Sequence, residues 1–275
     1  MNHLKPADIL ETLVETGVSK AESSWRKLLI LGILAGAFIS FAGASSTLAS
    51  YSMVSDPMTF GVGKAFAGVI FTGGLIFVVL AGAELFTGNS LISLAVYEKR
   101  ITLGQMLRNW GIVYIANFIG SIFIVLVISH IDMLDAGEGM LGAVTVKTAA
   151  AKVNMDFSKA LLSGLLCNWL VCLAVWCSTG ADSTIGKIFS IFFPIWIFVI
   201  SGFEHCIANM YFIPAGIIAS YNESYVALSG LGQDMLANLT WQGMFLHNML
   251  PVTIGNLLGG VVFVAASYWI SIKKS

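Results

Sequence analysis

Glu204 and His205 stand side by side within the long apolar stretch Ile188–Asn222. An imidazole can donate a hydrogen bond to an anion, and it can carry a proton near neutral pH. Ionisable groups are costly inside a bilayer and usually line the path of a substrate. We therefore expect His205 to act on a small anion, or on a proton, as it crosses a membrane.

Glu204 belongs to a motif, G-x-E-x-x-x-x-N, that occurs twice, in GAELFTGN and again in GFEHCIAN. The glutamates of the two motifs are Glu84 and Glu204, and the asparagines are Asn89 and Asn209. A carboxylate in an anion path would repel the substrate, so we interpret these four residues as scaffold. Each glutamate could accept hydrogen bonds from backbone N–H groups that a helix break sets free.

Membrane-spanning helices must position these residues. The chain is 57% hydrophobic and 11% charged, with a mean hydropathy of +0.86, whereas soluble domains carry about 25% charged residues. Four stretches lack Asp, Glu, Lys and Arg and are long enough to span once: Leu28–Ser50, Asn109–Ile131, Ala160–Ala181 and Met235–Ile272. Ala65–Tyr97 and Ile188–Asn222 are too long for one straight span, so we expect an interrupted helix in each.

This pattern predicts an all-α integral membrane protein with six transmembrane helices in two inverted three-helix repeats. An amphipathic segment, residues 1–27, precedes a single channel domain, residues 28–272, whose repeats cover about 28–131 and 160–272. The second and fifth helices are interrupted, and such helices meet near the midplane in transport proteins. Leu85 occupies the position that matches His205, so the histidine has no counterpart in the first repeat.

The charge distribution predicts the orientation. Six spans place both termini on one side, which then holds ten Lys and Arg residues against four on the other. The positive-inside rule makes the side with the termini cytoplasmic, in a multi-pass protein of the cell (inner, cytoplasmic) membrane. The net charge of −1 gives no sign of a nucleic-acid partner. The sequence predicts no metal site, no cofactor and no enzyme motif.

Four segments carry a resemblance to a known family: GAELFTGNSL, CNWLVCLAVW, SGFEHCIANMYFIPAG and LPVTIGNLLGG. Together, over about residues 8–271, they resemble the formate/nitrite transporter family, and the chain as a whole looks similar to its hydrosulfide-channel branch. The resemblance implies an aquaporin-like fold and a homopentamer with one pore per subunit in the lipid bilayer. It implies that formate, nitrite or hydrosulfide is the substrate.

By position, the resemblance implies pore roles for four polar residues: His205 at the centre, Thr87 beside it, Asn168 facing the pore and Lys152 in the outer vestibule. It also implies two apolar constrictions, built by Phe71, Leu75, Leu85, Val171 and Phe198. From the residues alone, Thr87 and Asn168 could equally form interhelical hydrogen bonds. Lys152 could equally be a solvated loop lysine.

Two mechanisms and two alternative functions stay open from the sequence. Either an imidazolium at His205 stabilises the anion, or a proton lets the anion cross as its neutral acid. An aquaporin-like pore for neutral solutes would share the six spans, but the chain contains no Asn-Pro pair. A membrane enzyme using His205, Glu204 and Cys206 would need a catalytic motif that the sequence lacks.

Overall fold

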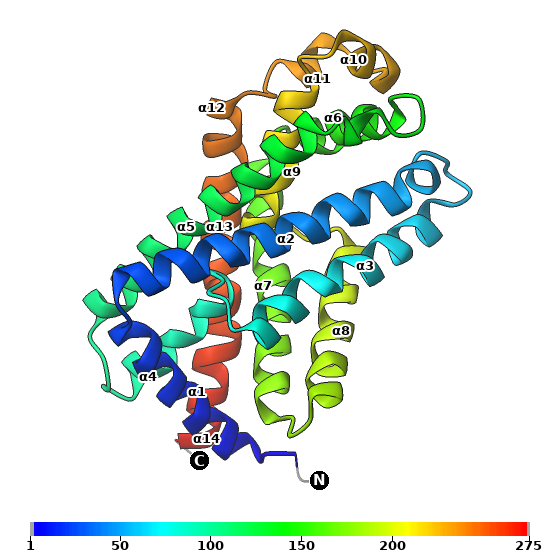
Figure 1. The fold of residues 1–275 in the computed structure, drawn as a ribbon. Helices are drawn as coiled ribbons and strands as arrows, with labels where there is room; N and C mark the ends of the chain where they lie inside the picture. Colours follow the sequence, from blue (N-terminus) through cyan, green and yellow to red (C-terminus); the bar gives the residue numbers. More distant parts are fainter. Residues whose placement is uncertain (1–2, 274–275) are drawn as a thin grey trace.

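The computed structural model describes residues 3–273, which are helical with irregular connections and contain no strand (Figure 1). Six segments are long and apolar enough to cross a membrane, as predicted: α2 (Trp25–Val54), α3 (Phe60–Ala81), α5 (Leu103–His130), α7 (Phe157–Gly180), α8 (Thr184–Ser201) and the C-terminal segment Trp241–Lys273. The last segment contains α12 (Trp241–Gly243), η3 (Met244–Met249), α13 (Leu250–Leu258), η4 (Gly259–Ala266) and α14 (Ser267–Lys273).

Both predicted interruptions are present. α3 ends at Gly82, and the chain resumes as the short helices η1 (Gly88–Ile92) and α4 (Ser93–Tyr97). α8 ends at Gly202 and is followed by α9 (Cys206–Ala219). The two glycines adopt left-handed backbone conformations, with φ of 76° and 71°. A residue without Cβ takes this conformation easily, so glycine ends each helix and turns the chain into the break.

We expect Gly82→Ala to lower the free energy of unfolding by about 1–2 kcal/mol, because Ala pays a steric penalty in the left-handed conformation. A Cβ at this position would meet no atom within 4 Å, so the effect would be conformational only. Thermal unfolding in detergent measures it. Gly73→Ala is the matched control, since Gly73 lies within α3 and its Cβ would also meet nothing. Equal unfolding temperatures for the two variants would contradict the expectation.

Two shorter helices pack against the breaks from opposite halves of the chain. α1 (Pro6–Glu22) buries an apolar face that includes Leu10 and Leu13, and it contacts η1 and α4. α6 (Met140–Val153) contacts α9 in the second half. The order α1–α2–α3–break is thus repeated as α6–α7–α8–break, and the amphipathic N-terminal helix takes part in the repeated arrangement.

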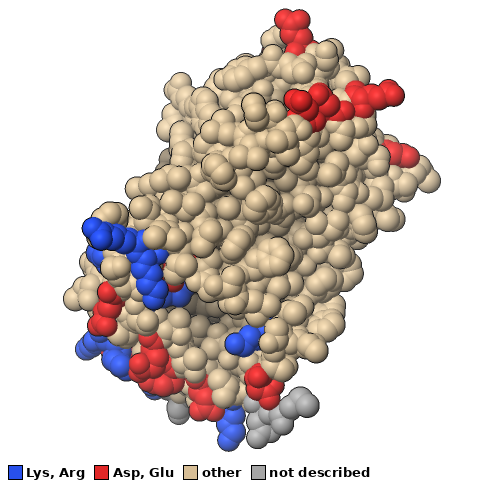
Figure 2. Space-filling model, viewed as in Figure 1, with Lys and Arg blue, Asp and Glu red and all other residues tan. Residues whose placement is uncertain are grey.

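The two ends of the molecule differ in charge. α1 and α14 lie at the same end (Figure 1). Figure 2 shows Lys and Arg together with Asp and Glu at this end, a broad band without charged residues above it, and Asp and Glu at the far end of the visible face. α10 (Glu223–Ser229) and α11 (Gln233–Leu236) contact α6 at that far end. An uncharged band between two charged ends is what a bilayer requires.

Polar contacts tie α14 and α1 to the loop between α4 and α5. Lys273 Nζ lies 3.3 Å from Glu98 Oε2, and Trp269 Nε1 donates to Glu98 Oε1 at 2.6 Å. The hydrogen bond from Trp269, with help from the charge of Lys273, holds the pKa of Glu98 below its ordinary value. Arg100 pairs with Glu15 of α1 at 3.0 Å. These pairs are at least partly exposed to solvent, so each adds little stability.

Candidate functional site

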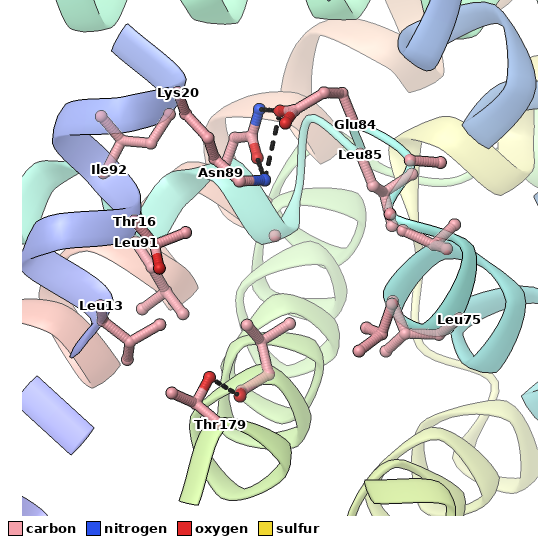
Figure 3. A pocket seen from close by; sticks show the side chains of 17 residues that line it. Leu13, Thr16, Lys20, Leu75, Glu84, Leu85, Asn89, Leu91, Ile92 and Thr179 are labelled. Carbon is pink, nitrogen blue, oxygen red and sulfur yellow. Dashed lines mark hydrogen bonds and ion pairs between the residues drawn. The ribbon is translucent and has the colours of Figure 1, made fainter. Parts of the chain in front are cut away.

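Four polar residues form a cluster beside the first break, here called the first cluster: the buried Glu84, Asn89 and Asn109, and the partly exposed Lys20. Lys20 Nζ lies 3.2 Å from Glu84 Oε2 and donates to Asn89 Oδ1 at 2.7 Å (Figure 3). The Asn89 amide donates to Glu84 at 2.7 Å and to Asn109 at 2.9 Å. Asn109 in turn donates to the backbone carbonyl of Lys20 at 3.1 Å. The carboxylate charge is therefore balanced within the cluster.

The second break carries the same arrangement, here called the second cluster: Lys152, Glu204, Asn209 and Asn248. Lys152 Nζ donates to Glu204 Oε1 at 2.7 Å. The Asn209 amide donates to Glu204 Oε2 and to Asn248 Oδ1, both at 2.7 Å. Asn248 donates to the carbonyl of Lys152 at 3.0 Å and to Glu204 Oε2 at 3.2 Å. The same residue types thus occupy matching places in both halves of the chain.

An asparagine on α5 satisfies the irregular backbone of the first break. Asn117 Oδ1 accepts the N–H of Phe86 at 3.0 Å, and its amide donates to the carbonyls of Gly32 and Glu84 at 2.8 and 2.9 Å. All three partners are backbone groups that lie in the apolar interior of the protein. An unpaired peptide group there costs on the order of several kcal/mol. Asn117 therefore stabilises the irregular backbone of the first break.

Asn256 does the same at the second break. Its Oδ1 accepts the N–H of Cys206 at 2.9 Å, and its amide donates to the carbonyls of Gly164 and Glu204 at 2.7 and 2.9 Å. This corrects the expected bonding of the two glutamates. The side-chain carboxylates of Glu84 and Glu204 accept from lysine and asparagine side chains, while asparagines on other helices satisfy the freed backbone groups.

His205 lies at the start of α9 and contacts Thr87 from the first break. Its Nδ1 accepts the N–H of Ala208 at 3.0 Å, so in the neutral ring the proton is carried by Nε2. Nε2 lies 2.9 Å from Thr87 Oγ1, and with this tautomer it donates to the threonine oxygen. The hydroxyl proton of Thr87 is then directed to another acceptor. The two interrupted spans thereby present one hydroxyl donor, supported by one imidazole.

Two cavities approach this pair from opposite sides. The first cavity, about 240 Å³, is lined by residues that include Leu13, Lys20, Leu75, Glu84, Leu85 and Leu91 (Figure 3). The second cavity, about 500 Å³, is lined by residues that include Lys64, Phe71, Lys152, Phe198, Glu204 and His205. Each cavity thus contains the lysine and glutamate of one cluster, and His205 lines the second.

Aromatic side chains surround the histidine at the inner end of the second cavity. The rings of Phe71 and Phe198 meet edge to face with centroids 5.7 Å apart, and Phe198 stacks on His205 at 6.0 Å. Phe71 also stacks on Phe212, over which Lys152 Nζ lies at 5.4 Å from the ring centroid. An ion passing these rings must lose most of its water, which is costly without compensating donors. Such a passage favours a neutral or well hydrogen-bonded species.

Asn168 and Val171 are buried on α7 and are not among the residues that line either cavity. The Asn168 amide donates to the carbonyl of Thr87 at 3.2 Å, to Ser90 Oγ at 3.1 Å and to the carbonyl of Asn256 at 2.7 Å. In this structure, Asn168 therefore holds the loop that presents Thr87. Leu75 and Leu85 line the first cavity, and Phe71 and Phe198 line the second.

Sequence reasoning missed several residues that support the breaks. Asn117 and Asn256 open the segments NFIG and NLLG, whose similarity indicates the repeat but does not indicate that these side chains bond the break. The sequence indicates a role for Lys20 at the first break only weakly, since this residue lies in an amphipathic helix where a solvated lysine is ordinary. Asn109 and Asn248 precede Asn117 and Asn256 by equal intervals. This equal spacing could have indicated from the sequence that the four asparagines have matching roles in the two repeats.

Comparison with known proteins gives consistent matches along the chain. A family model described as Formate/nitrite transporter matches residues 7–270. An uncharacterized transporter, YrhG, of Bacillus subtilis is 40% identical over 98% of this chain and 94% of its own length. The formate channel FocA of Escherichia coli is 38% identical over 97% and 94%, respectively.

Two solved structures share the fold. A structure described as a pentameric formate channel with formate bound has a TM-score of 0.80 and 36% identity, covering 90% of this chain and 97% of that one. A structure described as an FNT family ion channel has a TM-score of 0.81 and 28% identity, covering 96% and 99%. These relatives and neighbours are channels and transporters rather than enzymes.

Proposed function

The chain belongs to the formate/nitrite transporter family, and on that premise we propose that it conducts small monovalent anions of weak acids, with formate as the first candidate. The names of its relatives support formate more directly than nitrite or hydrosulfide. The pentameric formate channel, which shares its fold, supports a homopentamer with one pore in each subunit. The end that carries α1 and α14 is assigned to the cytoplasm from the distribution of Lys and Arg.

The observation that carries the proposal is the contact between His205 and Thr87 at 2.9 Å, because it joins the two interrupted spans between the two cavities. A small anion at this point meets the Thr87 hydroxyl as a donor, with the Nε2–H of His205 behind it. The phenylalanines on one side and Leu75 and Leu85 on the other would resist the bare ion. Donors placed between apolar constrictions are a common basis of selectivity in pores.

A proton accounts for passage through both apolar regions. Since Nδ1 of His205 accepts the Ala208 N–H, a protonated ring must give up this bond, so the resting ring is neutral. The negative charge of an anion beside the ring favours protonation of the ring at Nδ1. Nε2 then releases its proton to Thr87 Oγ1, and the Thr87 hydroxyl releases its own proton to the anion. The neutral acid leaves, and the ring is then neutral with its proton on Nδ1. The resting tautomer returns when Nε2 takes up a proton from water and Nδ1 releases its own, which restores the bond from the Ala208 N–H.

Lys152 takes part at the deep end of the second cavity, which by this assignment opens to the outside. Its ammonium group is paired with Glu204, so it supplies hydrogen bonds near the path with little net charge. The paired clusters thus place polar groups beside an anion path without the repulsion that an uncompensated carboxylate would exert. Asn168 contributes by holding the loop that carries Thr87.

Flux into proteoliposomes tests the function. We expect the purified protein to carry formate, nitrite and hydrosulfide far faster than chloride, because chloride is the anion of a strong acid and cannot cross as a neutral molecule. The measurement compares initial rates for the four anions over a pH series from about 5 to 8. Initial rates that do not depend on the acid strength of the transported anion would contradict a proton-linked route.

The same vesicles test the alternative of a neutral-solute pore. Rapid osmotic swelling with water or glycerol, without anion flux above that of empty vesicles, would favour the alternative. Empty vesicles are essential controls, since neutral weak acids also cross lipid unaided. A variant in which Thr87→Val removes the hydroxyl donor controls for nonspecific leakage through the protein.

A further inference from the structure

The second cavity is lined by three lysines, Lys64, Lys147 and Lys152, and by the single carboxylate of Glu204. Lys152 is bonded to that carboxylate at 2.7 Å. Among residues 3–273, neither Lys64 nor Lys147 forms a hydrogen bond through its ammonium group or an ion pair within 4 Å. The cavity therefore has an excess of positive charge, and this excess is carried by lysines other than the one paired with Glu204.

Lys64 is the better placed of the two unpaired lysines. It is the fifth residue of α3 and is partly buried, whereas Lys147 is exposed. Its Nζ lies 3.8 Å from the position that a Cβ on Gly202 would occupy, directly beside the second break. It is also within electrostatic reach of Lys152 and Glu204. A partly buried charge is less screened by salt and water than an exposed one, so Lys64 acts more strongly on an ion inside the cavity.

Lys64 is not part of the repeated scaffold. When the two breaks are aligned on Gly82 and Gly202, the position that matches Lys64 in the second half is Thr184. The lysine that lines the first cavity is Lys20, and it is paired with Glu84. The extra positive charge thus belongs to one mouth of the pathway, much as His205 belongs to one repeat.

We propose that Lys64 is the residue that first binds the substrate anion in the second cavity, before the anion reaches the phenylalanines. The ligand is a small monovalent anion, and the ammonium group binds it as a direct ion pair or hydrogen bond. This inference rests on the proposed function, because it assigns a binding step to the same anion pathway. It also makes the two mouths unequal, with tighter anion binding at the second cavity than at the first.

Concentration dependence of formate flux in Lys64→Met tests the proposal. Right-side-out and inside-out membrane vesicles from the same cells expose the second and the first cavity, respectively, to added formate. We expect the half-saturating formate concentration in right-side-out vesicles to rise about tenfold, because a cavity of one charge sign raises the local concentration of an oppositely charged substrate by this order. In inside-out vesicles it should be unchanged. Lys64→Arg, which keeps the charge, should behave as the wild type.

A matched control removes a lysine at the same end of the molecule but outside the cavity. Lys159→Met fits, since Lys159 is exposed and paired with Asp156. Wild-type half-saturation in right-side-out vesicles of Lys64→Met, or an equal rise in Lys159→Met, would overturn the proposal while leaving the channel function intact. Failure of the wild type to carry any weak-acid anion would overturn the proposed function and this inference with it. Size-exclusion chromatography of each purified variant checks that it elutes at the same volume as the wild type and so has the same oligomeric state.

Discussion

Lys152→Met is expected to lower the free energy of unfolding by about 3–5 kcal/mol, because it leaves the Glu204 carboxylate buried without its cation. The Glu204 side chain is 5% exposed, and its remaining donors are the amides of Asn209 and Asn248. Both amides bond Oε2, so the substitution also removes the hydrogen bond of Oε1, and the amides cannot neutralise the charge. Thermal unfolding and subunit dissociation in detergent measure the loss.

A double-mutant cycle separates the ion pair from the packing of the long lysine side chain. We expect Lys152→Met combined with Glu204→Gln to recover part of the stability, since Gln is neutral and keeps an acceptor for Asn209. Lys159→Met is the control for loss of an exposed pair, and its unfolding temperature should match the wild type. Additive effects of the Lys152 and Glu204 substitutions would contradict a coupled pair.

Lys20→Met, the corresponding change in the first cluster, should lower the free energy of unfolding by less than Lys152→Met. Lys20 is 27% exposed, against 14% for Lys152, so water can partly replace its contact with Glu84. The two clusters therefore contain the same residue types but differ in how far their lysines are buried. Comparison of Lys20→Met with Lys152→Met in the same detergent would reveal this difference without any assumption about transport.

The broad architecture could be predicted because the membrane constrains it strongly. The long stretches around Glu84 and Glu204 had to be interrupted, since straight helices of that length overshoot a bilayer. The structure places each interruption at the glycine that opens the repeated motif, Gly82 or Gly202, which adopts the left-handed conformation that ends a helix. The contact between Thr87 and His205 was implied by family resemblance, and spacing alone would not have joined two segments so far apart in sequence.

The hydrogen bonds that hold the breaks open could not be predicted in the same way. Asn117 and Asn256 reach the breaks from other helices, so their partners depend on helix packing rather than on local sequence. The carboxylates of Glu84 and Glu204 were expected to bond freed backbone groups, but a carboxylate bonds preferentially to a lysine when the fold brings one near. Lys64 escaped notice because a lysine near the start of a span is usually a solvated residue.

His205→Asn is expected to steepen the dependence of formate flux on pH. Above the pKa of a carboxylic acid, the fraction of neutral acid falls tenfold per pH unit. A pore that only admits preformed acid must show this slope, whereas one that protonates the anion inside should fall less steeply. Asn retains an acceptor for the Ala208 N–H at the start of α9, so the variant removes the titratable ring while keeping the cap.

Comparison with His205→Ala distinguishes the role of the ring in proton transfer from its role in structure. Ala lacks the capping acceptor, so this variant should also lose about 1 kcal/mol of stability, whereas His205→Asn should unfold near the wild-type temperature. Both variants should show a flux that declines about tenfold per pH unit between pH 5 and 7. If the wild type shows that slope as well, the ring does not supply the proton. The imidazole would then act only as a hydrogen-bond donor to Thr87, and the anion would have to meet its proton in the second cavity.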